Sequence, residues 1–196
     1  VIGTTRNDTM TGSSGDNTLT GGDGNDTFYV TLGNDFIYGD AGNSDKMDFS
    51  GITITGPNTN GFYNTVDLNS THKAVFWTGT GGTVSNNTNL FSIENIIGSS
   101  YTDYLIGENI SAYGNTLDGG AGDDSIEGLA GDDFLIGGTG DDHIEGGLGS
   151  DIMYGGRADR SGIDSSNDWV VYDSATGGVV VNIDNSSAHG TTSAGP

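Results

Sequence analysis

The sequence predicts an all-β protein whose short parallel strands wind into a coil, a β-solenoid. Three observations predict it: an unusual composition, a nine-residue repeat, and an alternation of polar and apolar residues inside that repeat. Gly accounts for 36 of the 196 residues, which excludes a mainly helical protein because each Gly inside a helix costs about 1 kcal/mol relative to Ala. A collagen-like chain is excluded by the presence of only 2 Pro and by the lack of a triplet repeat.

The charge of the chain points to a bound cation. Asp and Glu together number 27 against 5 Lys and Arg, which gives a formal net charge of -22. Such a chain repels nucleic acid and anionic membranes, so neither is expected as a partner. With 32% hydrophobic residues, the chain is either disordered or neutralised by a cation on which its folding depends. No apolar run approaches the roughly 18 residues of a membrane span, and the first residues lack the features of a signal peptide.

A nine-residue repeat organises most of the chain. Four consecutive copies run from Gly119 to Tyr154, as GGAGDDSIE, GLAGDDFLI, GGTGDDHIE and GGLGSDIMY. Each has Gly at its first and fourth places, Asp at its sixth and an aliphatic residue at its eighth, which in the last copy is Met153 or its neighbour Ile152. Near the start, the same frame reads GTTRNDTMT, GSSGDNTLT, GGDGNDTFY and VTLGNDFIY. A looser copy follows from Gly39, and GSSYTDYLI and ISAYGNTLD precede the second block.

Each repeat combines a turn with a short strand. Gly, Asp and Asn tolerate positive φ, so the first six places can form a turn whose carbonyls point inward. The last three places alternate polar, apolar and polar, as in a strand with one buried face. Two repeats complete one turn of the coil, so residues 18 apart stack, as Asp8 over Asp26 and Asp124 over Asp142.

Stacked carboxylates repel one another unless a cation lies between them. Ca²⁺ suits such sites because it accepts roughly 6–8 oxygen ligands in a flexible geometry, backbone carbonyls included. Mg²⁺ demands a stricter octahedron, and the lack of Cys and the isolated positions of the 3 His argue against Zn²⁺. The expected side-chain ligands are the residues at or near the sixth place: Asp8, Asn17, Asp26, Asp35, Asp45, Asp103, Asn115, Asp124, Asp133, Asp142 and Asp151, with Asp159 or Asp168 after the break in spacing that follows Tyr154.

The repeat G-G-x-G-x-D-x-U-x resembles that of the RTX family, the haemolysin-type calcium-binding nonapeptide repeat proteins. The resemblance implies a right-handed parallel β-roll with two repeat blocks and an interrupting β excursion, and we expect roughly five to nine Ca²⁺ ions. It also implies that carbonyls of the first, second and fourth places complete each shell. Carried over, these carbonyls belong to Gly21, Gly22, Gly24, Thr31, Gly33, Gly119, Gly120, Gly122, Gly128, Leu129, Gly131, Gly137, Gly138, Gly140, Gly146, Gly147 and Gly149.

Some repeats depart from the family's pattern. Arg6, Tyr101 and Tyr113 replace the fourth-place Gly, and Asn17 and Asn115 replace the sixth-place Asp. We expect weaker or incomplete sites at these repeats, which would then act as caps.

The chain is expected to divide into four parts. Residues 1–49 form the first repeat block and 98–173 the second, while 50–97 form a β excursion packed on the roll. Residues 174–196 form the terminal strand and tail of a truncated module. The excursion consists of β segments separated by turns rich in Asn, Gly and Pro.

The aromatic residues of the excursion allow two interpretations. Phe62, Tyr63, Phe76 and Trp77 favour a small hydrophobic plug, and the alternative is a face on which sugars stack.

No sequence feature points to catalysis, so the protein is not expected to be an enzyme. The adjacent pairs Asp123–Asp124 and Asp132–Asp133 recur in register, whereas a catalytic carboxylate pair should be singular. His143 occupies a seventh place and is expected on a solvated strand surface, and no H-E-x-x-H or G-x-S-x-G motif occurs.

The resemblance implies a secreted, extracellular or cell-surface module that folds on Ca²⁺ binding. It would belong to a larger type I-secreted bacterial polypeptide, such as an adhesin or a toxin, and have that polypeptide and the ions as partners. The alternative is a carbohydrate-binding accessory module of a polysaccharide-modifying enzyme. Its ligand would be a neutral glycan or a cell-surface ligand, because the 5 basic residues are too scattered to bind an anionic glycan.

Overall fold

The computed structural model describes residues 1–29, 31–51, 64–68, 73–78, 84–109, 114–156, 167–172 and 175–182. Within these residues the chain consists of β-strands and turns, which confirms the predicted fold class. The chain forms two compact units, Val1–Ile97 and Gly98–Pro196, and the four-part division stays a prediction. No helix among these residues has the length and hydrophobicity that crossing a bilayer requires.

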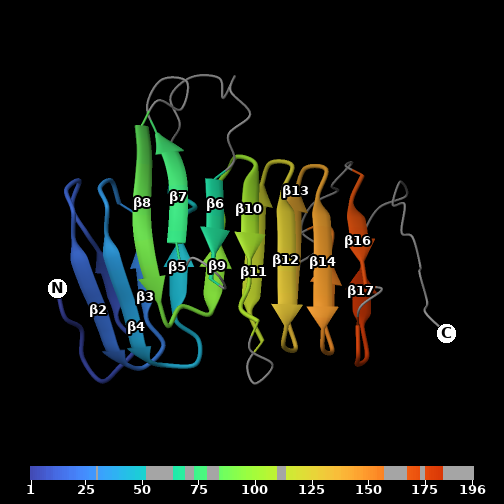
Figure 1. Ribbon diagram of the computed structural model, residues 1–196, viewed down its shortest axis with the longest axis horizontal. Helices are drawn as coiled ribbons and strands as arrows, with labels where there is room; N and C mark the ends of the chain where they lie inside the picture. The colour runs from blue at the N-terminus through green and yellow to red at the C-terminus, as the bar shows by residue number, and fades with distance from the viewer. Residues whose placement is uncertain are drawn as a thin grey trace. The chain divides into compact units, whose positions relative to one another are not determined.

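The first unit contains two layers of strands. They are β1 (Thr9–Thr11), β2 (Thr18–Asp23), β3 (Thr27–Tyr29), β4 (Phe36–Ala41), β5 (Lys46–Asp48), β6 (Asn64–Asp67), β7 (Lys73–Thr78), β8 (Val84–Phe91) and β9 (Asn95–Ile97). One layer has the parallel order β1-β3-β5-β9. The other has β2, β4 and β8 in parallel, followed by β7 and β6 in antiparallel. From β1 to β5 the chain alternates between the layers, as a coil requires (Figure 1).

The second unit repeats this coil more regularly. Its strands are β10 (Asp103–Ile106), β11 (Thr116–Ala121), β12 (Ser125–Ala130), β13 (Phe134–Thr139), β14 (His143–Leu148), β15 (Ile152–Tyr154), β16 (Trp169–Val171) and β17 (Val180–Asn182). The parallel orders are β10-β12-β14-β16 in one layer and β11-β13-β15-β17 in the other. Ile126 pairs with Ile144 and Leu117 with Leu135. Two repeats therefore complete one turn.

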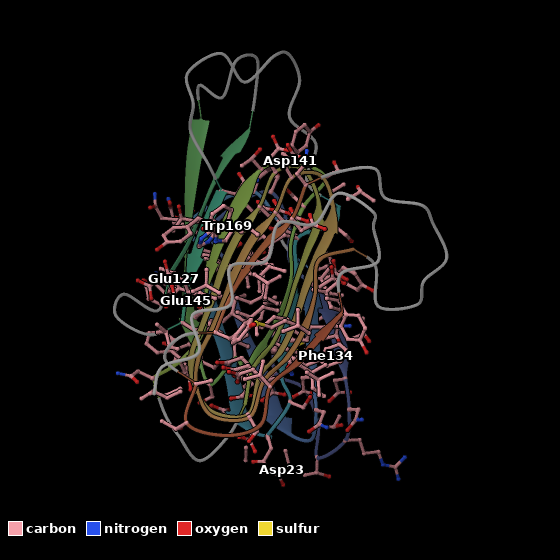
Figure 2. All side chains as sticks on the ribbon, turned by 90° about the vertical axis from the view of Figure 1, so that its right-hand side faces the viewer. Asp23, Glu127, Phe134, Asp141, Glu145 and Trp169 are labelled. Carbon is pink, nitrogen blue, oxygen red and sulfur yellow. The ribbon has the colours of Figure 1, made fainter. Side chains whose placement is uncertain are left out.

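Eighth-place side chains fill the space between the two layers of each unit. In the second unit Ile126, Leu135 and Ile144 are fully buried, and each such side chain contributes about 1.5–3 kcal/mol by its burial. Met153 is buried, whereas Ile152 is 37% exposed, so Met153 holds the eighth place of its repeat. Seventh and ninth places face outward, and Figure 2 shows Glu127 and Glu145 on one outer face of this unit and Phe134 on the other.

The excursion continues the sheet of the first unit edge to edge. Residues Asn89–Phe91 of β8 pair in parallel with Phe36–Tyr38 of β4, and β7 and β6 follow beyond β8. Val66 and Leu90 are buried in this region, and the rings of Tyr38 and Phe91 stack with their centroids 4.8 Å apart. The residues Phe62 and Tyr63 and the side chains of Phe76 and Trp77 lie outside the described part, so the plug and the sugar face stay predictions.

Candidate metal centre

The turns between strands bring backbone carbonyls into stacks. In the regular repeats the second and fourth places lie in the left-handed region, as at Gly120 (φ 98°) and Gly122 (φ 127°), where Gly avoids the strain of a side chain. A Cβ added at Gly138 would come within 3.0 Å of the Gly120 carbonyl oxygen, and one at Gly140 within 3.0 Å of the Gly122 oxygen. The carbonyls of successive turns therefore point along the stack and into the turn that follows.

The sixth-place side chains form hydrogen-bonded ladders. Oδ1 of Asp142 accepts the backbone N–H of Asp124 at 2.9 Å, and Oδ1 of Asp151 accepts that of Asp133 at 3.1 Å. Each carboxylate thus binds the sixth-place residue of the preceding turn. The same bond joins Asp26 to Asp8, Asp35 to Asn17, Asp45 to Asp26, Asp124 to Asp103, Asp133 to Asn115, and Asp168 to Asp142.

In several repeats the second carboxylate oxygen, Oδ2, has no hydrogen-bond donor in the part of the chain that the structure describes. Oδ2 of Asp26, Asp45, Asp124, Asp133 and Asp151 is buried and receives no hydrogen bond from the described residues. A buried carboxylate oxygen without a partner is costly. Burial accordingly raises the pKa of Asp124 to about 7 and that of Asp133 to about 6, with neighbouring carboxylates adding to the rise. Burial thus favours the protonated form of these two carboxyl groups, whereas a bound cation would favour the charged form.

Glycine at the first place leaves room beside that oxygen. A Cβ added at Gly128 would lie within 3.0 Å of both Asp133 Oδ2 and the carbonyl oxygen of Gly146, one turn later. The space beside Gly119 is bounded in the same way by Asp124 Oδ2 and the carbonyl oxygen of Gly137. A carboxylate and a carbonyl from successive turns thus converge on a space that any side chain would fill.

This donor set fits Ca²⁺. It consists of hard oxygen atoms from carboxylates and main-chain carbonyls, which Ca²⁺ accepts together. Among the described residues no group of three or more His, Cys, Asp or Glu side chains gathers as an ion-holding cluster. A Ca²⁺ ion held here would take carbonyl oxygens for much of its shell, and the first, second and fourth places are where the sequence predicts them.

Where the second place carries Ser or Thr, a protein donor serves the carboxylate instead. The hydroxyl bonds are Thr4 to Asp8 Oδ2 (2.8 Å), Thr31 to Asp35 Oδ2 (3.1 Å) and Ser99 to Asp103 Oδ2 (2.9 Å). Asn17 and Asn115 are served similarly, since their Oδ1 atoms accept the backbone N–H of Ser13 and Glu108. These repeats satisfy their sixth-place side chains from within the chain.

The fifth-place carboxylates form a separate, exposed ladder. Oδ1 of Asp123 accepts the N–H of Asp141 at 3.0 Å, and Oδ1 of Asp132 accepts the N–H of Ser150 at 2.9 Å. All of these residues are solvent-exposed, and Figure 2 labels Asp141 at a turn. Adjacent Asp residues therefore differ in role, one facing water and the next facing the turn interior. His143 is exposed on β14, where the sequence predicts it.

Two irregular repeats return to the ladder after long insertions. Asp168 is 4% exposed and accepts the N–H of Asp142, so the break after Tyr154 does not disturb the stack. Asp159, the other candidate, lies outside the described residues. Glu94 was missed by the sequence analysis, although its Oε2 accepts the N–H of Asp45 at 2.8 Å. The available signal was a carboxylate just before the short segment NII, which has no complete turn before it.

Comparison with protein families decides what these repeats are. The RTX calcium-binding nonapeptide repeat matches the chain in four copies, at residues 2–37, 25–43, 111–143 and 127–159. The chain carries RTX calcium-binding nonapeptide repeats. Its parallel layers form the β-roll of an RTX module, and the module binds Ca²⁺. The RTX repeat is a structural calcium-binding unit and not a catalytic one. Comparison with curated proteins gives no match.

Proposed function

We propose that this RTX chain is a Ca²⁺-triggered folding and spacing module of a larger secreted protein, such as an adhesin or a toxin. The observation that carries the proposal is the buried Oδ2 atom without a donor, which recurs at Asp124, Asp133 and Asp151 beside a first-place Gly. In this proposal the sixth-place side chains and the first-, second- and fourth-place carbonyls hold the ions, roughly five to nine in number.

The energetics support folding outside the cell. Extracellular modules bind Ca²⁺ with dissociation constants of roughly 10⁻⁴–10⁻³ M. At a free concentration ten times the dissociation constant, each site adds about 1.4 kcal/mol to the stability of the folded state. Several sites in one roll add an amount comparable with the whole stability of a domain, about 5–15 kcal/mol. At the low Ca²⁺ concentration inside a cell the same sites add almost nothing.

The net charge of -22 strengthens this dependence. A chain with so few hydrophobic residues and so much like charge stays expanded until cations neutralise it. Each ion contacts two successive turns, so one filled site orders half of the next. Folding should therefore be cooperative in Ca²⁺.

A Ca²⁺ titration of folding tests the proposal. Far-UV circular dichroism of the whole chain is expected to show little β structure in a chelator and a steep transition between micromolar and millimolar Ca²⁺. Mg²⁺ serves as the control and is expected to substitute poorly. A full β signal in chelator, a Hill coefficient of about one, or equal rescue by Mg²⁺ would contradict it.

A further inference from the structure

The chain re-enters the repeat frame at the end of β8. The N–H of Asn87 donates to Asn34 Oδ1 at 3.3 Å, as fifth-place residues do elsewhere. The N–H of Asn89 donates to the carbonyl of Asp35 at 2.8 Å, as seventh-place residues do. Thr88, between them, therefore holds a sixth place.

The next turn is condensed into three residues between β8 and β9. Glu94 Oε2 accepts the N–H of Asp45 at 2.8 Å, and Asn95 donates its N–H to the carbonyl of Asp45 at 2.9 Å. A Cβ added at Gly39 would come within 3.0 Å of both Asp45 Oδ2 and the carbonyl oxygen of Ser92.

A regular turn of the second unit shows the same three relations. Asp142 Oδ1 accepts the N–H of Asp124, and His143 donates its N–H to the carbonyl of Asp124 at 2.8 Å. A Cβ at Gly119 would meet Asp124 Oδ2 and the carbonyl of Gly137. By this correspondence Glu94 is a sixth-place residue, Asn95 a seventh-place residue and Ser92 a first-place residue.

The Oδ2 atom of Asp45 indicates that this turn binds an ion. Asp45 is fully buried, and its Oδ2 receives no hydrogen bond from the described residues. We propose that Asp45, Glu94 and the carbonyl of Ser92 form a Ca²⁺ site that lies outside the nonapeptide motif. This proposal rests on the proposed function, in that the turns of the module take up Ca²⁺.

Local geometry explains why the residue is Glu. Ser92 adopts a left-handed conformation (φ 52°) that turns the chain within one residue. The shortened turn leaves out the residues that would carry the backbone to its usual position, and the longer Glu side chain covers the remaining distance. Ile93, between the two, is 1% exposed and fixes the turn to the core.

Another turn of the first unit, the one that follows Asp35, has no carboxylate at its sixth place. Thr88 holds that place, so this turn carries a hydroxyl where the turn after Asp45 carries the carboxylate of Glu94. The Oδ2 atom of Asp35 receives its hydrogen bond from Thr31 at 3.1 Å. At Asp45, by contrast, Oδ2 receives no hydrogen bond from the described residues, and the following turn brings the carboxylate of Glu94 to the backbone N–H of Asp45.

The site would fasten the excursion to the first repeat block. Asp45 lies just before β5, and Glu94 lies between β8 and β9, with residues 50–91 between them in the chain. An ion shared by both carboxylates closes this loop, so Ca²⁺ would order the return strands together with the roll.

Glu94→Gln tests the site against Glu145→Gln, which changes an outward-facing ninth-place residue of β14. Equilibrium dialysis with radioactive Ca²⁺ is expected to find one ion fewer per chain for Glu94→Gln and an unchanged number for Glu145→Gln. An unchanged number and affinity for Glu94→Gln, with the wild type still folding in Ca²⁺, would overturn this site and leave the proposed function standing. Failure of the wild type to fold in Ca²⁺ would instead contradict the proposed function.

A measurement on the wild type covers the case in which Glu94→Gln does not fold. The chain has 4 Glu, so ¹³C labelling of Glu carboxyl groups gives a simple spectrum. Exchange of Ca²⁺ for La³⁺ is expected to move the resonance of Glu94, because a ligand senses the ion directly, and to leave those of Glu127 and Glu145 in place. A Glu94 resonance insensitive to the ion would show that it only accepts the Asp45 N–H, which would overturn the site.

Discussion

The two units use the same turn and differ in how they satisfy its carboxylate. In the second unit Asp124, Asp133 and Asp151 each keep a buried oxygen without a donor. In the first unit Asp8 and Asp35 receive a hydroxyl hydrogen bond from the Thr four residues earlier. In the proposed sites a cation would take the place of that hydroxyl, and only the hydroxyl is present at every Ca²⁺ concentration.

From this difference we expect dependence on Ca²⁺ to be set repeat by repeat at the second place. In the repeats of Asp124, Asp133 and Asp151, this place is held by Gly120, Leu129 and Gly147. None of the three has a side chain that can donate a hydrogen bond. Both units contain both kinds, since Asp26 and Asp45 of the first unit keep an oxygen without a donor and Asp103 of the second unit receives the hydroxyl of Ser99. We expect the second unit to rely more heavily on Ca²⁺.

Removal of Ca²⁺ should produce the largest contrast. When Ca²⁺ is lowered toward the folding transition, amide hydrogen exchange is expected to accelerate more in β11–β15 than in β1–β4, because more of the second unit's turns then hold an uncompensated buried charge. Exchange read by mass spectrometry gives the opening free energy of each segment, about 1.4 kcal/mol for each tenfold change in rate. Equal acceleration in both units would break the comparison.

Replacing one sixth-place carboxylate should have the next largest effect. Asp133→Asn keeps an oxygen for the N–H of Asn115 but loses the charge that the ion needs, so Ca²⁺ affinity should fall by roughly tenfold or more, about 1.4 kcal/mol per tenfold. Asp132→Asn, one residue away on the exposed ladder, is the matched control and should change little. Calorimetry that finds equal losses for the two variants would contradict the assignment of the places.

Acidification should stabilise the Ca²⁺-free second unit. The pKa values of Asp124 and Asp133 in the folded state, about 7 and about 6, lie above the ordinary value of 3.8, so folding favours proton uptake. Their contribution to the unfolding free energy is fully present below about pH 4 and is lost as the pH rises through about 7. Circular dichroism in Ca²⁺-depleted buffer should therefore show more β structure at pH 5 than at pH 8.

The double variant Asp124→Asn/Asp133→Asn is the control for this pH dependence. It should lose most of the difference between pH 5 and pH 8, whereas a general relief of the net charge would leave that difference intact.

Filling the space beside one first-place Gly should have a moderate effect. Gly128→Ala puts a Cβ against Asp133 Oδ2 and the Gly146 carbonyl, and overpacking of this kind costs about 1–3 kcal/mol. The control is Gly178→Ala, since nothing lies within 4 Å of its added Cβ. Thermal unfolding in saturating Ca²⁺ measures both variants. Equal midpoints would contradict the close contacts that the structure gives the added Cβ.

Removing one hydroxyl should have the smallest effect. It should leave Asp35 Oδ2 without a donor, as the corresponding atoms of Asp124 and Asp133 are. Thr31→Val deletes the hydrogen bond to Asp35 Oδ2, which should cost about 0.5–1.5 kcal/mol at the lowest Ca²⁺ concentration at which the chain folds. Thr9→Val, an exposed Thr on β1, is the control. Urea unfolding at low and at saturating Ca²⁺ should show the stability of Thr31→Val depending more strongly on the ion than that of the wild type. An unchanged Ca²⁺ dependence would show that the hydroxyl does not stand in for a cation.

The regular repeats could be predicted from the sequence because one physical pattern recurs in them. Gly and Asp fix the turn, a single aliphatic residue fixes the inward face, and the period of nine fixes which residues stack, as Ile126 on Ile144. The ladder bonds of Asp124 and Asp142 follow from that stacking. Family comparison bears out the repeat itself, and the individual ligands stay predictions.

The irregular turns were harder to predict because spatial register there is independent of sequence spacing. Asp168 follows Asp142 in the ladder at a separation of 26 residues, so the sequence offered it only as one of two candidates, with Asp159. Glu94 follows Asp45 at a separation of 49 and was missed. The hydrogen bonds to the preceding turn place these residues, and no periodicity encodes them. The pairing of second-place hydroxyls with sixth-place side chains was also hidden, since Ser and Thr are common at turns for other reasons.

The location of bound Ca²⁺ tests the central claim most directly. Crystals of the Ca²⁺-loaded chain, measured at a wavelength where calcium scatters anomalously, should show peaks in the turns beside Oδ2 of Asp26, Asp45, Asp124, Asp133 and Asp151, the atoms that lack a protein donor. Peaks confined to the exposed fifth-place carboxylates such as Asp123 and Asp132, with none beside those Oδ2 atoms, would contradict it.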